Sequence, residues 1–519
     1  MRLLLGRKAA GDRNVPDVVP SGGRPYMLRP WRMHLDVRLD NESPLPIYIQ
    51  IANAIVHDIE RGRLAPGEFL PSTRSMAQLL SVNRKTIVLA YDELIAQGWI
   101  ESAGTSGTKV SEAFGLRTPA SEDRMKRAPV SDTKAPFYDF RPPPARPLAV
   151  LNGKDTHKID EGSPDGRLFP ADVLARAFRT AMTRLSRNNT LSYGDPRGSR
   201  ELREVIADML KTERGLPINV ENVCLTRGSQ HGIFLAALTI LRPGDTVVVE
   251  DLTYEPAVMV FRAIGVRVVS VGLDEDGVDV EALSRLCERE RVSLVFLTPH
   301  HQFPTTVSLR PERRLHLIEL ARRHRFAILE DDYDHEFHFH SQPLLPMASY
   351  APENVIYVGS LSKLVLPALR LGYVVAPAPV IEALAHHVSV LDGMGSIITE
   401  TAVSSLIQEG ELRRHARKAA RIYAGRRDAF AVMLHEIFGQ NISFTKPQGG
   451  LAFWVRFVNP ECLQRIETNA TSMNLRFAPS ESYSASGRKV PGLRIGFASM
   501  NETEARQVLL GMGKASNTA

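Results

Sequence analysis

The chain has 519 residues, of which 43% are hydrophobic and 24% charged, and a formal net charge of +6. This length allows more than one domain and a large core, and the composition is ordinary for a soluble protein. The slight basic excess permits nucleic-acid binding without establishing it.

Several protein classes are excluded at this stage. No apolar run approaches the roughly 20 residues of a membrane span, and Leu3-Leu4-Leu5 is too short for a signal-peptide core. The three cysteines are far apart and match neither a zinc-binding spacing nor a disulfide framework. We therefore expect a cytoplasmic protein without a membrane partner.

Residues 1–43 are rich in arginine, glycine and proline and contain few acids. They show neither a helical nor a strand period, so we expect a disordered arm or an over-long gene start. A basic arm that contacts nucleic-acid phosphates is the functional alternative.

Residues 44–111 predict a small helical domain. Apolar residues from Ile51 to Ile59 recur at helical spacing, which predicts a helix over 47–61. Ser72 is a good N-cap and opens a short second helix.

A tight turn at 81–83 leads to a third helix over 84–97, which Gly98 ends. Two helices joined by so short a turn form a helix-turn-helix, whose second helix enters the DNA major groove. Residues 99–110 predict a β-hairpin, the wing.

Charges of opposite sign are separated along this segment, although its net charge is near zero. Residues 72–91 contain three cations and no acid. A small helical bundle without DNA binding fits the same helix pattern. The side chains that could meet phosphates and base edges are Arg74, Asn83, Arg84, Lys85, Thr86 and Lys109.

The sequence Leu70-Pro-Ser-Thr-Arg-Ser-Met-Ala77, followed by Val82-Asn-Arg-Lys-Thr86 and Ala90-Tyr-Asp-Glu-Leu94, resembles the winged helix of GntR-family transcription regulators. The resemblance implies a double-stranded DNA operator as partner. Residues 112–155, where proline-rich runs alternate with charges, predict an extended linker to a second domain.

In residues 156–515, apolar strands alternate with amphipathic helices. This alternation predicts a mainly parallel sheet covered by helices on both faces, with ligand sites beyond the carboxyl ends of the strands. The predicted strands are 246–249, 266–271, 293–297, 327–329 and 355–358.

One lysine follows the last of these strands after a turn of small residues. If Lys363 is buried, its amine pKa falls, and a neutral amine can form a Schiff base with an aldehyde. Ser360, Ser362 and Arg370 are what a nearby phosphate would need. These residues indicate pyridoxal 5'-phosphate (PLP) on Lys363; the alternative is a strand-turn-strand with a surface lysine.

Two further motifs are ambiguous by themselves. Gly228-Ser229-Gln230 precedes a helix and could bind phosphate at its N-terminus, or could be an ordinary cap. Residues 330–336 form an acidic cluster, which is either a solvated loop or the source of a buried carboxylate for the pyridine nitrogen. We expect no metal site, because the acids lack spaced histidine partners and the adjacent His300 and His301 should diverge.

Gly359-Ser-Leu-Ser-Lys363, followed by Pro367-Ala-Leu-Arg-Leu-Gly-Tyr373, resembles the PLP-lysine segment of fold type I aminotransferases. It is most similar to the version in the MocR subfamily of GntR regulators. The implied fold is an α+β winged helix-turn-helix domain followed by an α/β fold type I aminotransferase-like domain. That second domain has a mainly parallel central sheet and a small C-terminal α/β subdomain.

The resemblance also implies roles for individual residues. Phe303 stands where aminotransferases carry asparagine, and Thr306 replaces a usual glycine, so one cofactor contact and one turn should differ. The remaining roles are the phosphate cup at Gly228, Ser229 and Gln230, ring stacking by Tyr254, the pyridine-nitrogen carboxylate Asp331, the 3-hydroxyl contact Tyr333, contact with the neighbouring subunit's cofactor by Tyr193, and substrate-carboxylate binding by Arg494.

The expected function is a PLP-dependent transcription regulator. Its large domain would sense PLP, an amino compound or both through a Lys363 aldimine, in a head-to-tail, domain-swapped homodimer. A working aminotransferase with an accessory DNA-binding domain is the alternative, and the change at Phe303 argues mildly against fast turnover. A third reading is a DNA-binding protein whose large domain no longer binds PLP.

Overall fold

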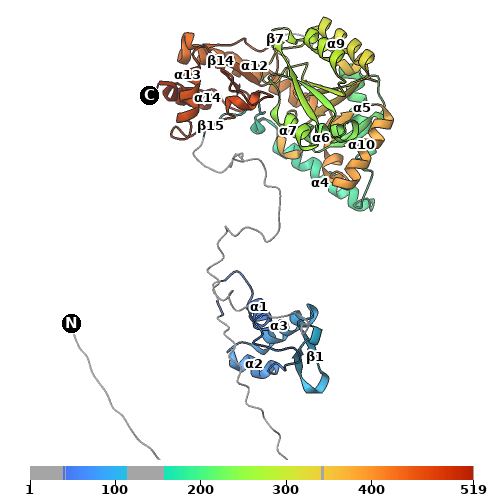
Figure 1. Ribbon diagram of the computed structural model, residues 1–519, viewed down its shortest axis with the longest axis vertical. Coiled ribbons are helices and arrows are strands. Elements are labelled where there is room, and N and C mark those ends of the chain that lie inside the picture. Colours follow the sequence, from blue (N-terminus) through green and yellow to red (C-terminus); the bar gives the residue numbers. More distant parts are fainter. Residues whose placement is uncertain (1–38, 41–42, 114–156, 340–343, 518–519) are drawn as a thin grey trace, which may run out of the picture. The chain divides into compact units, whose positions relative to one another are not determined.

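The computed structural model describes residues 39–40, 43–113, 157–339 and 344–517. The expected arm and linker lie almost entirely outside these residues. The chain divides into two compact units, residues 1–147 and 148–519, and each is described here by itself (Figure 1).

The first unit is a winged helix, as predicted. Ser72 caps the second helix by accepting a hydrogen bond from the Ser75 N–H at 3.2 Å. The hairpin pairs Ile100 with Val110. Its elements are α1 (Ile47–Glu60), α2 (Thr73–Leu79), α3 (Arg84–Ala96), β1 (Ile100–Ser102) and β2 (Thr108–Val110).

The helices of this unit close around the apolar residues whose spacing predicted them. Ile51 and Ile55 of α1, Met76 of α2 and Ile87 of α3 are fully buried. The buried Tyr91 hydroxyl donates a hydrogen bond to the Pro71 carbonyl at 2.8 Å, which fixes α3 against the segment that leads into α2.

A seven-stranded sheet forms the centre of the second unit (Figure 1). Five strands pair in parallel, as predicted, while β12 is antiparallel to both of its neighbours. β4 was not predicted as a strand. In spatial order the strands are β4 (Val223–Thr226), β12 (Gly372–Val375), β11 (Val355–Ser360), β10 (Ala327–Asp332), β9 (Leu294–Leu297), β5 (Thr246–Glu250) and β6 (Arg267–Val271).

Alternate residues of these strands enter different hydrophobic clusters, because successive strand side chains point to opposite faces. On β9, Val295 and Leu297 pack in one cluster, and Leu294 and Phe296 in the other. The first cluster includes α4 (Ala171–Arg187), α5 (Arg200–Arg214), α8 (Val280–Arg289), α9 (Pro311–His324) and α11 (Ile397–Gln408). The second includes α6 (Ser229–Ile240), α7 (Glu255–Ala263) and α10 (Ala378–Leu391).

A smaller C-terminal α/β subdomain has its own core, which includes the buried Phe430, Phe453 and Leu509. Throughout the described part of the chain, no helix combines the length and apolar character needed to cross a membrane. The subdomain contains α12 (Glu411–Phe438), β13 (Ile442–Ser443), β14 (Ala452–Phe457), α13 (Pro460–Asn469), β16 (Gly492–Gly496) and α14 (Glu502–Asn517). Two-residue pairings complete the unit: β15 (Leu475–Arg476) with β3 (His157–Lys158), and β7 (Leu273–Asp274) with β8 (Gly277–Val278).

Gly372, the first residue of β12, should not tolerate a side chain. An added Cβ would lie 2.8 Å from the Gly359 carbonyl oxygen and 2.9 Å from the Gly228 backbone. We expect Gly372→Ala to lower the free energy of unfolding by about 1–3 kcal/mol, because backbone atoms cannot move aside cheaply. Urea unfolding followed by circular dichroism measures this change.

The matched control is Gly425→Ala, on the exposed side of α12, where nothing lies within 4 Å of an added Cβ. It should be neutral or stabilise by up to about 1 kcal/mol. Equal changes in the free energy of unfolding for Gly372→Ala and Gly425→Ala would contradict the packing argument.

Candidate functional site

The candidate residues meet at one edge of the large sheet, where β4, β10 and β11 end. β10 continues through the acidic cluster, because Asp331 and Asp332 pair with Val358 and Gly359 of β11. Both acids are 3% exposed. The interpretation of this cluster as a solvated loop is therefore wrong at these positions.

Lys363 lies in the turn after β11 and is partly buried. Its ammonium group donates a hydrogen bond to the Gly162 carbonyl and lies 6.0 Å from the centre of the Tyr333 ring. Burial lowers the pKa of this amine from its ordinary value. The geometry therefore supports the amine chemistry that the sequence predicted, rather than a fully solvated lysine.

Asp331 is a buried carboxylate with an unused oxygen. Its Oδ1 has no hydrogen-bond partner among the described residues. Burial, together with the neighbouring charges of Asp332 and Asp334, raises the pKa of Asp331 to about 8. A cationic N–H donor placed here would satisfy this oxygen and lower that pKa, and a protonated pyridine nitrogen is such a donor.

The predicted phosphate-binding residues are brought together. Gly228 precedes α6 with φ +80°, and an added Cβ there would lie 3.2 Å from Nη1 of Arg370. Arg370 donates to the Arg227 carbonyl at 2.8 Å. The Ser362 N–H donates to the Ser360 hydroxyl at 3.2 Å, and the buried Ser362 hydroxyl has no partner in the part of the chain that the structure describes.

Ser229 is the first residue of α6, so its backbone N–H lies at the helix N-terminus. The Gln230 amide instead donates to the Pro256 carbonyl at 2.9 Å. The helix N-terminus, two serines and Arg370 therefore offer donors of the kind that a phosphate requires.

Tyr254 and Phe303 form an aromatic wall. Their rings meet edge to face with centroids 5.3 Å apart. Thr306 adopts φ +65°, a conformation that glycine adopts freely, and its N–H donates to the Gln302 carbonyl at 2.7 Å. Thr306 therefore occupies a backbone conformation that suits the glycine it replaces.

Arg494, on β16, is 2% exposed. Its guanidinium donates to the Glu161 carbonyl at 2.8 Å, the Pro304 carbonyl at 2.9 Å and the Tyr333 hydroxyl at 3.1 Å. The Tyr333 hydroxyl in turn donates to the His301 carbonyl at 2.9 Å. Tyr333 therefore connects Arg494 on β16 with the segment after β9 that contains His301.

Tyr193 is not brought into this group; its side chain is 93% exposed. In the winged helix, Arg74, Arg84 and Lys85 are exposed. The Asn83 side chain caps α3 by accepting from the Lys85 N–H at 2.9 Å, and Thr86 lies in the first turn, partly buried. Lys109 pairs with Glu101 at 3.0 Å and with Glu112 at 2.8 Å.

Sequence reasoning missed one contributor to the site, the segment between β3 and α4. Glu161 is partly buried, its pKa is raised by burial, and its carbonyl accepts from Arg494. Gly162 accepts from Lys363. The segment has no periodic pattern. Its contacts are with residues about 200 and about 330 positions away in the chain, so the local sequence could not predict them.

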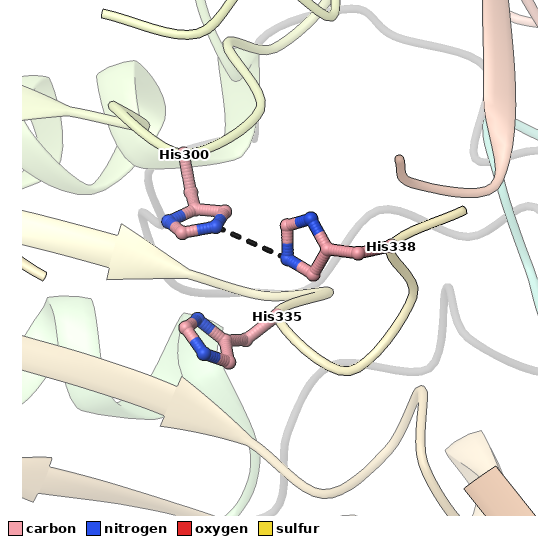
Figure 2. Close-up of side chains that lie close together, drawn as sticks. All are labelled: His300, His335 and His338. Atoms are coloured by element: carbon pink, nitrogen blue, oxygen red, sulfur yellow. Dashed lines mark hydrogen bonds between the residues drawn. The ribbon is translucent and has the colours of Figure 1, made fainter. Parts of the chain in front are cut away.

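Three histidines also gather at this edge of the sheet (Figure 2). His300 follows β9, and His335 and His338 follow β10. Nε2 of His300 and Nε2 of His338 are 3.1 Å apart. Burial lowers the pKa of His300 to about 2 and that of His338 to about 4, so both rings are neutral near pH 7.

Residues 159–511 match the family model described as aminotransferase class I and II, and residues 47–110 match that of the bacterial regulatory proteins of the gntR family. The chain belongs to the class I and II aminotransferase family. It carries a GntR-type DNA-binding domain in front of the aminotransferase-class domain, as the sequence predicted.

Relatives with both domains include the probable rhizopine catabolism regulatory protein MocR of Rhizobium meliloti. It is 27% identical over 90% of this chain and 93% of the relative. The HTH-type pyridoxine biosynthesis transcriptional regulator PdxR of Corynebacterium glutamicum is 28% identical over 92% of this chain and 97% of its own length.

Solved aminotransferases share the fold of the second unit. The kynurenine aminotransferase of Pyrococcus horikoshii, solved in complex with PMP, has a TM-score of 0.64 and 25% identity, covering 70% of this chain and 91% of that one. The α-aminoadipate aminotransferase LysN of Thermus thermophilus, complexed with N-(5'-phosphopyridoxyl)-L-leucine, has a TM-score of 0.64 and 26% identity, covering 70% and 92%. The predicted aminotransferase-like fold is confirmed.

The raised pKa of Asp331 should make stability depend on pH. The folded protein keeps this proton up to about pH 8, whereas the unfolded chain loses it near pH 4. Between these values, rising pH therefore favours unfolding through this group. We expect Asp331→Asn, measured without PLP, to become more stable relative to wild type by up to about 1.4 kcal/mol per pH unit.

Urea unfolding at pH 5 and at pH 7.5 gives the difference between variant and wild type at each pH. Asp208→Asn, at an exposed position of α5, is the control. A difference between Asp331→Asn and wild type that does not change with pH would contradict the prediction.

Proposed function

We propose that this protein is a DNA-binding transcription regulator whose aminotransferase-class domain binds PLP and senses an amino compound. The observation that carries the proposal is the placement of Lys363, Asp331 and the Gly228 turn at one sheet edge, in a chain that also has a GntR-type winged helix. The relatives with both domains are named as regulators.

The residues present fit PLP. When bound, PLP supplies an aldehyde carbon and an electron-withdrawing pyridine ring. Lys363 provides an amine whose lowered pKa favours the neutral, nucleophilic form. Asp331 would accept the N–H of a protonated pyridine nitrogen, and Tyr254 would provide an aromatic face.

The phosphate would be held where the donors converge. The N-terminus of α6 at Ser229 offers backbone N–H groups and the positive end of a helix dipole. Ser362 offers an unused hydroxyl, and Arg370 a guanidinium next to Gly228. An ordinary helix cap would require none of these side chains.

Arg494 is the proposed site for a carboxylate of the amino compound. The Phe303 ring lies 4.8 Å from its guanidinium carbon, and its Nε, Nη1 and Nη2 atoms already donate to Glu161, Pro304 and Tyr333. These contacts fix the plane of the guanidinium, which suits bidentate binding that lysine cannot provide.

The proposed assembly is a head-to-tail homodimer. Tyr193 is an aromatic side chain left almost fully exposed, and the family places this residue at the neighbouring subunit's cofactor. The proposed DNA-contacting residues are the exposed Arg74, Asn83, Arg84 and Lys85, with Thr86 and Lys109; contact by Lys109 would compete with its two carboxylate partners.

An active aminotransferase is the second candidate. Lys363, Asp331, Tyr333 and Arg494 all lie at the sheet edge or beside it, which is the set that amino-group transfer requires. Conversion of the bound cofactor by amino donors in a single turnover, followed by sustained turnover with a keto-acid acceptor, would favour the enzyme. A change of the bound cofactor that is limited to a single turnover, with no sustained turnover, would favour the sensor.

Cofactor binding should depend on Lys363. We expect wild-type protein incubated with PLP to show a visible absorbance band, and borohydride to remove that band and leave the reduced cofactor on the Lys363 peptide in mass spectrometry. Lys363→Ala should show neither, whereas Lys211→Ala, at an exposed position of α5, should match wild type. Wild-type protein without the band in excess PLP would refute the cofactor proposal.

DNA binding should depend on the exposed cations of α3. We expect Lys85→Ala to weaken binding to a duplex selected from a random pool and to reduce the slope of log affinity against log salt by about 1, because one phosphate contact is lost. Arg61→Ala, at the exposed residue after α1, is the control. Fluorescence anisotropy across a salt series measures the affinity and its salt slope. Equal slopes for Lys85→Ala and wild type would contradict the placement of Lys85 at DNA.

A further inference from the structure

The three histidines introduced above, His300, His335 and His338, have the geometry of a metal-ligand set. One ring nitrogen from each can be chosen so that all lie within 4.8 Å of one another. Figure 2 shows the three rings gathered around one space, with His300 arriving from one segment and the other two from another.

The closest nitrogen pair has a separation that a shared metal ion would produce. Nε2 of His300 and Nε2 of His338 are 3.1 Å apart. Tetrahedral zinc with Zn–N distances of about 2.0–2.1 Å places two ligand nitrogens roughly 3.3 Å apart. One ring nitrogen of His335 lies within 4.8 Å of ring nitrogens of the other two, so His335 would have to move closer to complete a tetrahedral set.

His335 has the supporting contact typical of metal-binding histidines. Its Nδ1 is 2.8 Å from Oδ2 of Asp332, so its Nε2 is left for a metal ion. The Tyr357 hydroxyl donates to the same carboxylate oxygen at 2.7 Å and holds it in place. A carboxylate behind a histidine fixes the ring orientation and strengthens the ligand.

Hydrogen bonding within the cluster accounts for only part of this arrangement. The His300–His338 contact satisfies one nitrogen of each ring, with one ring donating and the other accepting. It gives no reason for a carboxylate-oriented His335 beside the pair. A cation would use the lone pairs of all three rings.

We propose that His300, His335 and His338 bind one divalent transition-metal ion, for which Zn²⁺ is the best match to three imidazoles with an open fourth position. This departs from the expectation of no metal site, which rested on the lack of spaced histidine partners for the acids and on the divergence of the adjacent His300 and His301. His301 is separately engaged, with its Nδ1 2.7 Å from Asp334. The second and third ligands instead come from the segment after β10.

The metal ion would join two segments that carry cofactor-site residues. The segment after β9 continues from His300 to Phe303, and the segment after β10 begins at Tyr333, directly after Asp331 and Asp332. Binding to the folded state alone stabilises that state. The metal site rests on the histidines and needs neither PLP nor DNA, so its failure would leave the proposed function untouched.

The test uses the full-length, tag-free chain treated with a chelator and then titrated with Co²⁺ alone. Wild-type protein should take up one Co²⁺ per chain, give the visible ligand-field absorption of a tetrahedral site, and release the Co²⁺ to Zn²⁺. His335→Gln and His338→Gln should each weaken binding at least about 100-fold, more than loss of a supporting partner would.

The control is His386→Gln. His386 and His387 are also adjacent, with ring centroids 6.0 Å apart, but they lie on α10 away from the cluster. This variant should bind Co²⁺ as wild type does. Stoichiometric binding that is unchanged in His335→Gln and His338→Gln, or the absence of stoichiometric binding in wild type, would overturn the proposal.

If His335→Gln or His338→Gln fails to fold, a measurement on the wild-type protein still tests the proposal. X-ray absorption of the wild-type zinc protein reports how many imidazoles surround the metal. Three imidazoles support the site, and coordination by oxygen alone overturns it. Thermal unfolding adds a further readout, since Zn²⁺ should raise the melting temperature of wild type and of His386→Gln but not that of His338→Gln.

Discussion

The candidate site depends on the parallel pairing of β10 with β11 as far as Asp332 and Gly359. This register carries Asp331 into the buried end of the sheet and delivers the chain to Lys363 a few residues after the neighbouring strand. It is possible only because Gly359 has no side chain: an added Cβ would lie 2.2–2.4 Å from the ring of Tyr373. β12 approaches the Gly228 turn at a second glycine, Gly372, where an added Cβ would lie 2.9 Å from the Gly228 backbone. Strand pairing and glycine packing therefore position the lysine, the carboxylate and the phosphate-binding turn together.

Three consecutive buried acids on β10 show how structural and functional carboxylates differ. Glu330 accepts the backbone N–H groups of Met347 and Ala348 at 2.9 and 3.0 Å. Asp332 accepts from Tyr357, contacts His335 and faces Arg214 at 3.6 Å. Asp331 has no such set of partners in the described structure. Its Oδ1, like Oδ1 of Asp332, is an unsatisfied buried acceptor, which costs about 1–3 kcal/mol. The protein retains this cost at the position where a cofactor would remove it, which is typical of binding sites.

Local pattern was enough to predict the winged helix, because its helices bury residues repeated at helical spacing and its caps are adjacent in sequence. The helix expected over 84–97 is α3, and the expected Ser72 cap is present. In the large domain the sequence predicted most strands of the central sheet and the candidate site residues beyond their carboxyl ends. It did not predict β4, although β9, also of four residues, was predicted. It also did not reveal the burial of Arg494, which depends on carbonyls of Glu161 and Pro304 far away in the chain. The histidine cluster was missed for the same reason: its members come from two segments that only the sheet brings together.

A sensor needs a ligand that stabilises one state of the protein more than another, because equal affinity for two states shifts nothing. In the proposed sensor, several buried groups of the site would respond to a bound ligand. Asp331 is held with a raised pKa and Lys363 with a lowered one, and the Ser362 hydroxyl has no partner among the described residues. A bound phosphorylated pyridine aldehyde would relieve all three costs at once, and an amino compound that took the place of Lys363 would return that amine to its position beside the Gly162 carbonyl. In the proposed sensor, the free energy for regulation would therefore originate in buried groups with shifted pKa values or unused hydrogen-bonding atoms, whether or not the same groups also support turnover.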